Sequence, residues 1–562
     1  MNTSETLAEL VRRWWDFELG EDPLYASYVG DHRHAARLPE ASLSAIDWRA
    51  GQRRLFRVEL AALDTRALSE QDAHSAAILA RLLDDALAEH RFGGHFLPFG
   101  SDRGFHIALT RLPNLCVIDS IAAGRAYLSR LAAIPRYFDQ HEALLREGLA
   151  RGISHPAIAF DGYLDTLTAH ALGEPEASVF YAPLRDLPAQ LGAAEREGLQ
   201  ASARALIRDA VAPAYARLAR FFAEVYFPAA RSTLACAALP NGKAYYQALI
   251  AKHTTLDLDA EAIHALGLKE VASLRAEAEG VMREAGFHGD FAAFLEYLRR
   301  DPRFYVERAE DYLGAAALIA KRADGLLPAY FARLPRLPYG IAPTPAAIAP
   351  RMPGGFYREP PAGGRVAGEY WVNVHDLPSR PLYVLEALTL HEAVPGHHLQ
   401  IALARELDLP AFRQNLCLTA YEEGWALYCE WLGKEMGFYR DPYSEFGRLT
   451  YALWRACRLV VDTGLHAFGW ERERAIAYLA DNTALSRHEC TTEIDRYITW
   501  PGQALGYKLG ELKLRALRSQ AQARLGPRFD LRAFHDALLA QGELPLDRLE
   551  LTIHRYLEHA TG

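Results

Sequence analysis

Three histidines and one glutamate lie within eight consecutive positions of the chain, as His391, Glu392, His397 and His398. Imidazole nitrogens are common zinc ligands, and a carboxylate beside a bound water can accept its proton. A His-Glu pair followed within two helical turns by another histidine is the pattern with which zinc hydrolases combine two ligands and a general base. The cluster therefore predicts one catalytic zinc ion, with Glu392 as the general base.

The spacing of these histidines departs from the usual arrangement, in which the second ligand follows the first by one helical turn. The residue at that position is Pro395, which has no N–H group and crowds the carbonyl of His391. Gly396 follows, and a Pro-Gly pair inside a helix predicts a kink or bulge. If the bulge absorbs two residues, His397 takes the ligand position. In a regular helix, His398 would instead share the face of His391, about 10 Å along the axis. We favour His397 as the ligand and assign His398 to the surroundings of the metal or to substrate contact.

A third ligand is expected on the next helical segment, residues 416–433, where apolar residues recur at helical spacing. This segment carries Glu422, Glu423 and Glu430. A glutamate is costly to bury unless it is paired or bound to a metal. Two histidines and one glutamate would leave one zinc position open for water, as in catalytic sites. The same ligand types also suit manganese or cobalt.

Two later segments carry further polar residues. Asp462 and His466 lie four residues apart on an expected helix, 451–466. The carboxylate could orient the imidazole, or the imidazole could stabilise a transition state, and an ordinary surface pair is the alternative. The last polar cluster consists of Arg496, Tyr497, Gln503, Tyr507 and Lys508. Arg496 or Lys508 could bind a substrate carboxylate, and salt bridges within the fold are equally compatible.

Several long motifs together point to a known family. They are His391-Glu392-Ala393-Val394-Pro395-Gly396-His397-His398-Leu399-Gln400, Glu423-Gly424-Trp425-Ala426-Leu427-Tyr428, Val461-Asp462-Thr463-Gly464-Leu465-His466, the stretch from Asp495 to Lys508, and Gly30-Asp31-His32-Arg33. On these motifs, nearly the whole chain resembles the bacterial family called domain of unknown function 885. The resemblance implies a fold similar to the helical zinc carboxypeptidases of the Taq type, and more distantly to the oligopeptidases and angiotensin-converting enzyme. Those relatives keep the tight histidine spacing that Pro395 precludes here.

The resemblance also implies roles for individual residues. The implied zinc ligands are His391, His397 and Glu423. In the helical zinc carboxypeptidases, a phenol in the C-terminal segment stabilises the oxyanion, which implies this role for Tyr507, with Tyr497 as the second choice. The resemblance also favours a catalytic contribution from His466. We assign Arg496, Tyr497, Gln503 and Lys508 of the last polar cluster to substrate binding.

Composition sets limits on the class of protein. Half of the 562 residues are hydrophobic, and the formal net charge of −9 argues against a nucleic-acid-binding protein. The six cysteines form no C-x-x-C pair, which indicates reduced core residues. The N-terminus lacks the features of a secretory signal, and no apolar run approaches the roughly 20 residues of a membrane span. We expect a cytoplasmic protein without membrane contact, and its oligomeric state stays open, with a homodimer as one option.

The periodicity predicts a mainly α protein. Together with the resemblance, this implies a large two-lobed helical metallopeptidase-like fold with a small β-sheet beside a central cleft. A single catalytic domain, residues 1–562, would comprise a helical N-terminal lobe (1–335), a crossing rich in proline and glycine with an edge strand (336–380), and a C-terminal lobe with the zinc-site helices (381–562). Prolines and glycines preclude a regular helix over residues 334–364 and predict a long ordered loop or crossing. Residues 368–374 predict a short strand, either a peptide-binding edge or the core of a small sheet.

The leading functional hypothesis is a zinc-dependent metallopeptidase that hydrolyses short peptides, as a carboxypeptidase or an oligopeptidase does. A second hypothesis is a zinc hydrolase of a non-peptide amide or ester, such as a modified amino acid, because the zinc chemistry would be the same. A third is an inactive metal-binding or interaction module, which would show no turnover on any amide.

Overall fold

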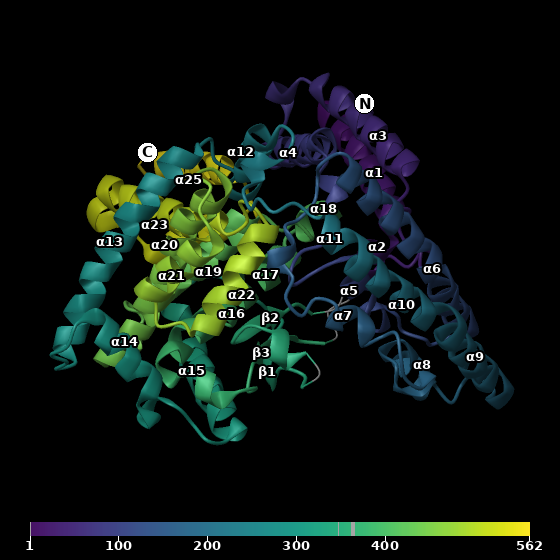
Figure 1. The fold of residues 1–562 in the computed structure, drawn as a ribbon. Helices are drawn as coiled ribbons and strands as arrows, with labels where there is room; N and C mark the ends of the chain where they lie inside the picture. Colours follow the sequence, from purple (N-terminus) through teal and green to yellow (C-terminus); the bar gives the residue numbers. More distant parts are fainter. Residues whose placement is uncertain (1, 347, 361–365, 562) are drawn as a thin grey trace. The chain divides into compact units, whose positions relative to one another are not determined.

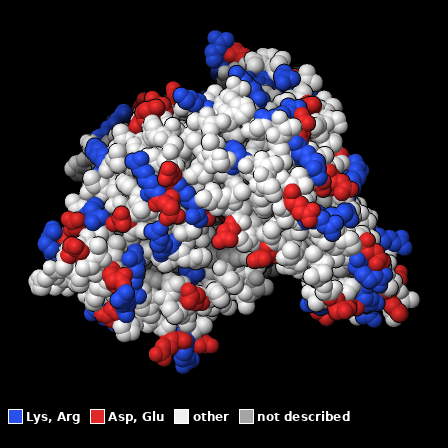
Figure 2. Space-filling model, viewed as in Figure 1, with Lys and Arg blue, Asp and Glu red and all other residues white. Residues whose placement is uncertain are grey.

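A computed structural model describes residues 2–346, 348–360 and 366–561 of the chain. Helices dominate these residues, and three short strands form one sheet (Figure 1). The predicted fold class, mainly α with a small β-sheet, is confirmed. None of the helices in the described ranges combines the length and the apolar character that a membrane crossing requires. Acidic and basic side chains are interspersed on the face that Figure 2 shows.

The chain divides into two compact units. The first comprises Met1–Leu234 and Ala238–Gly242, and the second comprises Ala235–Ala237 and Lys243–Gly562. Residues 243–335, which were expected in the N-terminal lobe, therefore belong to the same unit as the predicted zinc site. The reason is packing between distant segments, because α13 (Ala260–Glu284) lies along α20 (Pro442–His466).

Helices α1 to α11 build the first unit. The first of them begins with a capping box, in which the Asn2 side chain accepts a hydrogen bond from the Glu5 N–H and the Glu5 carboxylate accepts one from the Asn2 N–H. The bounds of the helices are α1 Thr3–Glu21, α2 Pro23–Tyr28, α3 Leu43–Ala61, α4 Glu70–Phe92, α5 Phe105–Leu109, α6 Ile121–Ala150, α7 Asp165–Thr168, α8 Ala182–Arg185, α9 Ala193–Leu206, α10 Ala212–Phe221 and α11 Phe227–Ala229.

The second unit contains the remaining helices. Besides α13 and α20, their bounds are α12 Gly242–Thr254, α14 Phe291–Arg300, α15 Ala309–Tyr330, α16 Leu385–Glu392, α17 His397–Glu406, α18 Ala411–Gln414, α19 Thr419–Leu432, α21 Arg472–Asn482, α22 Arg487–Thr499, α23 Leu505–Leu525, α24 Leu531–Leu539 and α25 Leu546–Thr561. The helices expected over residues 416–433 and 451–466 correspond to α19 and to the second half of α20.

The sheet has the strand order β1-β3-β2, with bounds β1 Tyr339–Pro343, β2 Gly355–Arg358 and β3 Gly368–Val372. β1 runs parallel to β3, and β2 runs antiparallel to it. β3 is thus the central strand, so the interpretation as a core strand is correct and the interpretation as a free edge is wrong. β1 and β2 lie in the stretch that was expected to be a loop, of which residues 347 and 361–364 are outside the described residues. β2 is an edge strand and packs against α16.

Helices α19 and α23 approach each other unusually closely because glycines meet at their contact. A Cβ atom added to Gly510 would lie 1.9 Å from the carbonyl oxygen of Ala420, and one added to Gly424 would lie 2.5 Å from Cα of Gly510. The two backbones are therefore in direct contact. The contact sets the separation of the helices that carry Glu423 and Tyr507.

We expect Gly510→Ala to destabilise the protein by about 1–3 kcal/mol, the usual cost of forcing an extra methyl group into a packed contact. Chemical denaturation followed by circular dichroism measures this change. Gly314→Ala is the matched control, because Gly314 also lies inside a helix but has nothing within 4 Å of its added Cβ. There, alanine should be neutral or stabilising by up to about 1 kcal/mol. Equal unfolding midpoints for Gly510→Ala and the wild type would contradict the close contact.

Candidate metal centre

The histidine-rich segment is a broken helix. α16 ends at Glu392 and α17 begins at His397, with four non-helical residues between them. The sequence predicted a kink or bulge within one helix, and the structure shows a complete break. The connection folds back tightly onto the end of α16, since a Cβ atom on Gly396 would lie 1.8 Å from the carbonyl oxygen of His391. Only glycine fits this approach.

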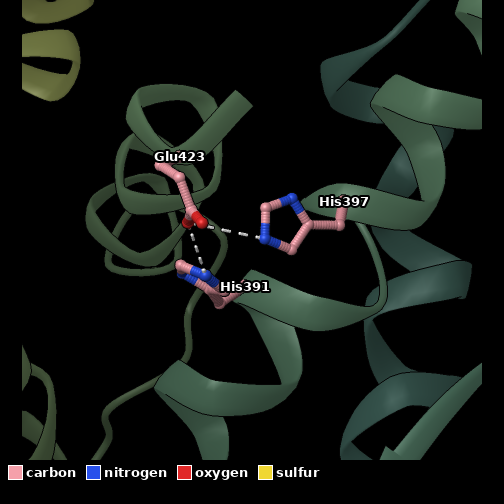
Figure 3. A group of neighbouring side chains, drawn as sticks. All are labelled: His391, His397 and Glu423. Carbon is pink, nitrogen blue, oxygen red and sulfur yellow. Dashed lines mark ion pairs between the residues drawn. The ribbon is translucent and has the colours of Figure 1, made fainter. Parts of the chain in front are cut away.

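The break brings two imidazoles together with one carboxylate from α19. His391 Nε2 lies 3.5 Å from Glu423 Oε2, and His397 Nε2 lies 3.7 Å from the same oxygen (Figure 3). The two rings are nearly perpendicular, with centroids 4.7 Å apart. One ligand atom of each residue lies within 4.8 Å of the others. The three predicted ligands therefore converge on one point, and His397 rather than His398 is the second imidazole.

The donor set fits a zinc ion. Donor atoms about 2.0–2.2 Å from a tetrahedral zinc ion lie about 3.4 Å from one another, which is close to the two nitrogen–oxygen distances. Burial alone would raise the pKa of Glu423, but its hydrogen bond to His391 and the charges of both imidazoles lower it to about 2. Burial and the charge of His391 lower the pKa of His397 to about 4. Burial also acts to lower the pKa of His391, but its hydrogen bonds to Glu423 and Glu430 raise this pKa to about 9, so a bound metal would have to displace the proton of this ring.

A second carboxylate contacts the other ring nitrogen of His391. Glu430, also on α19, places Oε1 2.8 Å from Nδ1 of His391, and both side chains are buried. Arg455 lies 3.6 Å from the same carboxylate oxygen. A carboxylate on the outer nitrogen of a metal-binding histidine fixes its tautomer and orientation. The sequence showed that Glu423 and Glu430 share a helix face, but it did not distinguish the ligand from the residue that orients a ligand.

We expect Glu430→Gln to weaken zinc binding by about 10–100-fold, the usual effect of losing such an orienting carboxylate. Competition with a fluorescent zinc chelator measures the dissociation constant. Glu435→Gln provides the control, because Glu435 follows α19 on the surface and pairs with Arg518. An unchanged dissociation constant in Glu430→Gln would show that the contact with His391 does not support metal binding.

The predicted general base is held in place by the sheet. Glu392 is buried, and its Oε2 accepts a hydrogen bond of 2.8 Å from the Tyr357 N–H on the edge strand β2. Burial raises the pKa of Glu392 to about 7, and His391 and the Tyr357 N–H offset part of this effect. A carboxylate with a pKa near neutrality is suited to both accepting and returning a proton.

Tyr507 contacts Glu423, and Arg496 contacts Tyr507. The Tyr507 hydroxyl hydrogen-bonds to Glu423 and accepts a hydrogen bond of 3.4 Å from Arg496 Nη2. Burial raises the pKa of Tyr507, so the phenol keeps its proton. Gln503 accepts a hydrogen bond of 2.8 Å from the same Arg496 nitrogen. The structure thus brings Tyr507, Arg496 and Gln503, three residues of the last polar cluster, to the candidate centre.

Four other predicted site residues form hydrogen bonds or ion pairs with other residues of the protein. Lys508 is completely buried and pairs with Glu511 at 2.7 Å and with Glu270 at 3.3 Å. The Tyr497 hydroxyl donates to Glu493 and accepts hydrogen bonds from Trp454 and Arg458. These contacts favour the alternative of salt bridges and hydrogen bonds within the fold, and the substrate-binding roles expected for both residues stay predictions.

The two histidines among these four are also structural. His398 Nδ1 lies 3.0 Å from the Tyr357 hydroxyl, and its ring contacts Tyr339. His466 Nδ1 accepts a hydrogen bond from the Cys236 N–H, and its Nε2 lies 2.9 Å from the Tyr497 carbonyl oxygen. Both rings thus form contacts within the protein, and their predicted roles in substrate contact and catalysis stay predictions. Asp462 does not face His466 either, because it binds the Tyr246 hydroxyl and the Gly502 N–H.

Comparisons with known proteins agree with the extent of the sequence motifs. The sequence model of a family described as "Bacterial protein of unknown function (DUF885)" matches residues 23–553. Two similar solved structures are each described as a putative lipoprotein. The first, from Colwellia psychrerythraea, is 28% identical, with a TM-score of 0.94 and 100% of both chains covered. The second, from Shewanella oneidensis and described as of unknown function, is 18% identical, with a TM-score of 0.76 and 98% and 99% of the two chains covered. No curated protein matches the chain.

Proposed function

This chain belongs to a family of bacterial proteins of unknown function, DUF885. From the candidate centre, we propose that it is a zinc-dependent peptidase of short peptides. The observation that carries the proposal is the convergence of His391, His397 and Glu423 beside the buried carboxylate of Glu392. Two imidazoles and one carboxylate leave a zinc position open, which is typical of catalytic sites. The relation to helical zinc carboxypeptidases that the motifs suggested is part of this proposal.

The proposed reaction is the addition of water to an amide. A bound zinc ion would supply a water with a pKa near 7 and would polarise the substrate carbonyl. Glu392 accepts the proton of the attacking water and returns it to the leaving amine. Its hydrogen bond from the Tyr357 N–H keeps one carboxylate oxygen fixed and leaves the other for the proton transfer that we propose.

The same step places negative charge on the former carbonyl oxygen of the substrate. Tyr507 is the donor for this oxygen, since its phenol lies beside Glu423 and keeps its proton. Arg496 donates to the phenol oxygen and makes the phenol a stronger donor. Gln503 holds the guanidinium in this position.

Hydrolysis of a peptide library by the zinc-loaded protein tests the proposal. The protein is stripped with a chelator, reloaded with zinc, manganese or cobalt, and mixed with short peptides and small non-peptide amides. We expect cleavage of peptides that disappears on chelation and returns with metal, and mass spectrometry of the products shows which bond is cut. Cleavage of non-peptide amides alone would favour the second hydrolase hypothesis, and no turnover of any amide would favour an inactive metal-binding module.

We expect Tyr507→Phe to lower kcat by about 10²–10³-fold with little change in KM, because the lost hydrogen bond forms fully only in the transition state. Steady-state kinetics on the best library peptide measures both constants. Tyr451→Phe is the control, because Tyr451 is a buried tyrosine of α20 that the proposed reaction does not use. A change in KM alone would show that Tyr507 binds the ground state and does not stabilise the oxyanion.

The location of the protein is also a proposal. The sequence favours the cytoplasm, whereas the description of the two similar solved structures supports a membrane-anchored location. Fractionation of cells that express the full-length protein distinguishes the two.

A further inference from the structure

Tyr507, Arg496 and Gln503 come from the connection between α22 and α23 and from the two helix turns that adjoin it. Arg496 lies in the last turn of α22, Gln503 in the connection and Tyr507 in the first turn of α23. Arg496 Nη2 lies 2.8 Å from Gln503 Oε1 and 3.4 Å from the Tyr507 hydroxyl. The conformation of residues 500–504 therefore determines whether these three side chains meet.

Asp462 on α20 binds the middle of this connection. Its side chain is completely buried. The Gly502 N–H lies 3.1 Å from Asp462 Oδ1 and 3.2 Å from its Oδ2, and the Tyr246 hydroxyl of α12 donates a hydrogen bond of 2.6 Å to Oδ1. The carboxylate thus fixes the backbone one residue before Gln503.

His466 lies one helical turn after Asp462 and binds the start of the same connection. The Cys236 N–H donates a hydrogen bond of 3.2 Å to His466 Nδ1. An imidazole nitrogen that accepts a hydrogen bond carries no proton, so the other nitrogen, Nε2, is the donor. It lies 2.9 Å from the carbonyl oxygen of Tyr497, the residue after Arg496. The imidazole thus holds the end of α22 that carries this arginine.

Packing against α12 restricts the connection further. Gly502 has a φ of +82°, and a Cβ atom at this position would lie 3.2 Å from the backbone of Leu249 on α12. Glycine adopts this left-handed conformation without a steric cost. Because Asp462 also binds Tyr246, the same carboxylate links the connection to the helix against which it packs. A shift of the connection would break the hydrogen bonds of Asp462 or bring its backbone against α12.

The arrangement needs a hydrogen-bond acceptor at Asp462 and does not need its charge. Burial raises the pKa of Asp462 to about 7, and the hydrogen bonds from Tyr246 and Gly502 offset part of this effect. A protonated carboxyl group still has acceptor capacity. Without an acceptor, the buried Gly502 N–H would be unsatisfied, which costs free energy that a movement of the connection would relieve.

We propose that Asp462 and His466 are positioning residues, which hold the two ends of the connection so that the Tyr507 phenol is placed for the reaction. Asp462 acts through the Gly502 N–H, and His466 acts through the Tyr497 carbonyl oxygen. The expected effect on rate rests on the proposed function. The position of the phenol is a property of the fold, so it can be measured without turnover.

Fluorine NMR of the full chain with 3-fluorotyrosine incorporated at position 507 measures the surroundings of the phenol. Asp462→Leu replaces the carboxylate with an apolar side chain of similar shape, and Asp462→Asn keeps one acceptor oxygen. We expect the resonance to shift or split in Asp462→Leu and to keep its wild-type position in Asp462→Asn. His466→Phe, which keeps a ring but loses both hydrogen bonds, should also shift it. If the leucine variant does not fold, Asp462→Ala removes the acceptor without adding bulk and should give the same shift.

Thr463→Val is the matched control for a general loosening of α20. Thr463 follows Asp462 on the helix, and its hydroxyl lies 2.8 Å from His264 Nδ1 on α13, away from the connection. Loss of this hydroxyl should lower the unfolding temperature without moving the fluorine resonance. A resonance that moves equally in Thr463→Val and Asp462→Leu would overturn the inference, and so would an unchanged resonance in the folded Asp462 and His466 variants.

Steady-state kinetics on the best library peptide relate the position of the phenol to the reaction. We expect Asp462→Leu to lower kcat by about 10²-fold with little change in KM, the effect of misplacing a reacting group by about 1 Å. In a Tyr507→Phe background, the same substitution should lower kcat by less than about twofold, because the hydroxyl that it misplaces is already absent. Equal losses of kcat in both backgrounds would show a general structural role and would overturn the inference.

The outcomes separate the inference from the function. If the fluorine resonance depends on Asp462 and His466 but the zinc-loaded wild type hydrolyses no peptide, the positioning of the phenol stands and the peptidase function fails. If peptides are hydrolysed and neither the resonance nor kcat changes in Asp462→Leu, the function stands and the inference fails.

Discussion

Glu392→Gln is expected to retain zinc and to lose about 10²–10⁴-fold in kcat/KM for peptide hydrolysis, the range that a general base contributes. Glutamine has nearly the same shape and can still accept the hydrogen bond that the Tyr357 N–H donates to Glu392. It cannot accept a proton from water at neutral pH. Metal content by elemental analysis and initial rates on the best peptide measure the two properties on the same preparation.

Glu386→Gln is the matched control for this variant. Glu386 lies on the same helix, where it pairs with Arg322 at 3.0 Å and accepts a hydrogen bond from the Tyr439 N–H. It does not face the three ligands, so its loss should leave kcat/KM nearly unchanged. Full activity of Glu392→Gln would exclude Glu392 as the base, and loss of zinc from this variant would show that it is a ligand.

The second large effect is expected from replacing the adjacent histidines His397 and His398, which should differ in zinc binding. His397→Ala should lose bound zinc and hydrolysis together, because it removes one of three ligand atoms. The decrease in affinity should exceed the roughly 10–100-fold cost of losing an orienting carboxylate. His398→Ala should keep stoichiometric zinc, because the His398 ring is bound to the Tyr357 hydroxyl and does not face Glu423.

Zinc stoichiometry, chelator competition and anomalous scattering from crystals grown with zinc measure this difference. The pair of variants is its own control, since both remove one buried imidazole from α17. Retention of zinc by His397→Ala together with its loss from His398→Ala would reverse the assignment. Loss of zinc from neither variant would place the metal elsewhere.

The parts of the centre that the sequence predicted are those set by local spacing. The Pro-Gly pair after His391 indicated that the helix could not continue, and the structure brings His397 together with His391 and Glu423 as expected. Glu423 could be predicted for the same reason, because it lies on one regular helix. The sequence predicted a kink or bulge and not the complete break between α16 and α17. The break includes a close approach of Gly396 to the His391 carbonyl, which depends on how the next helix packs.

The sequence could not show the partners of side chains whose contacts are distant in sequence. Lys508 pairs with Glu270 on α13, and nothing near Lys508 in the sequence indicates that contact. His466 accepts a hydrogen bond from the backbone of Cys236, 230 residues away. A polar residue in an apolar helix shows that some partner exists, but it does not show whether that partner is a substrate or another segment of the protein.

The glycine contact between α19 and α23 has a consequence for comparing related chains. The contact sets how far the Tyr507 phenol stands from the carboxylate of Glu423. A homologue that keeps both histidines but carries a bulkier residue in place of Gly424 or Gly510 would have its two helices pushed apart. Such a protein would keep the three candidate ligands without positioning the phenol for the proposed reaction. In a genome survey, these two small residues therefore separate chains with the complete candidate centre from chains that the histidines alone would group with them.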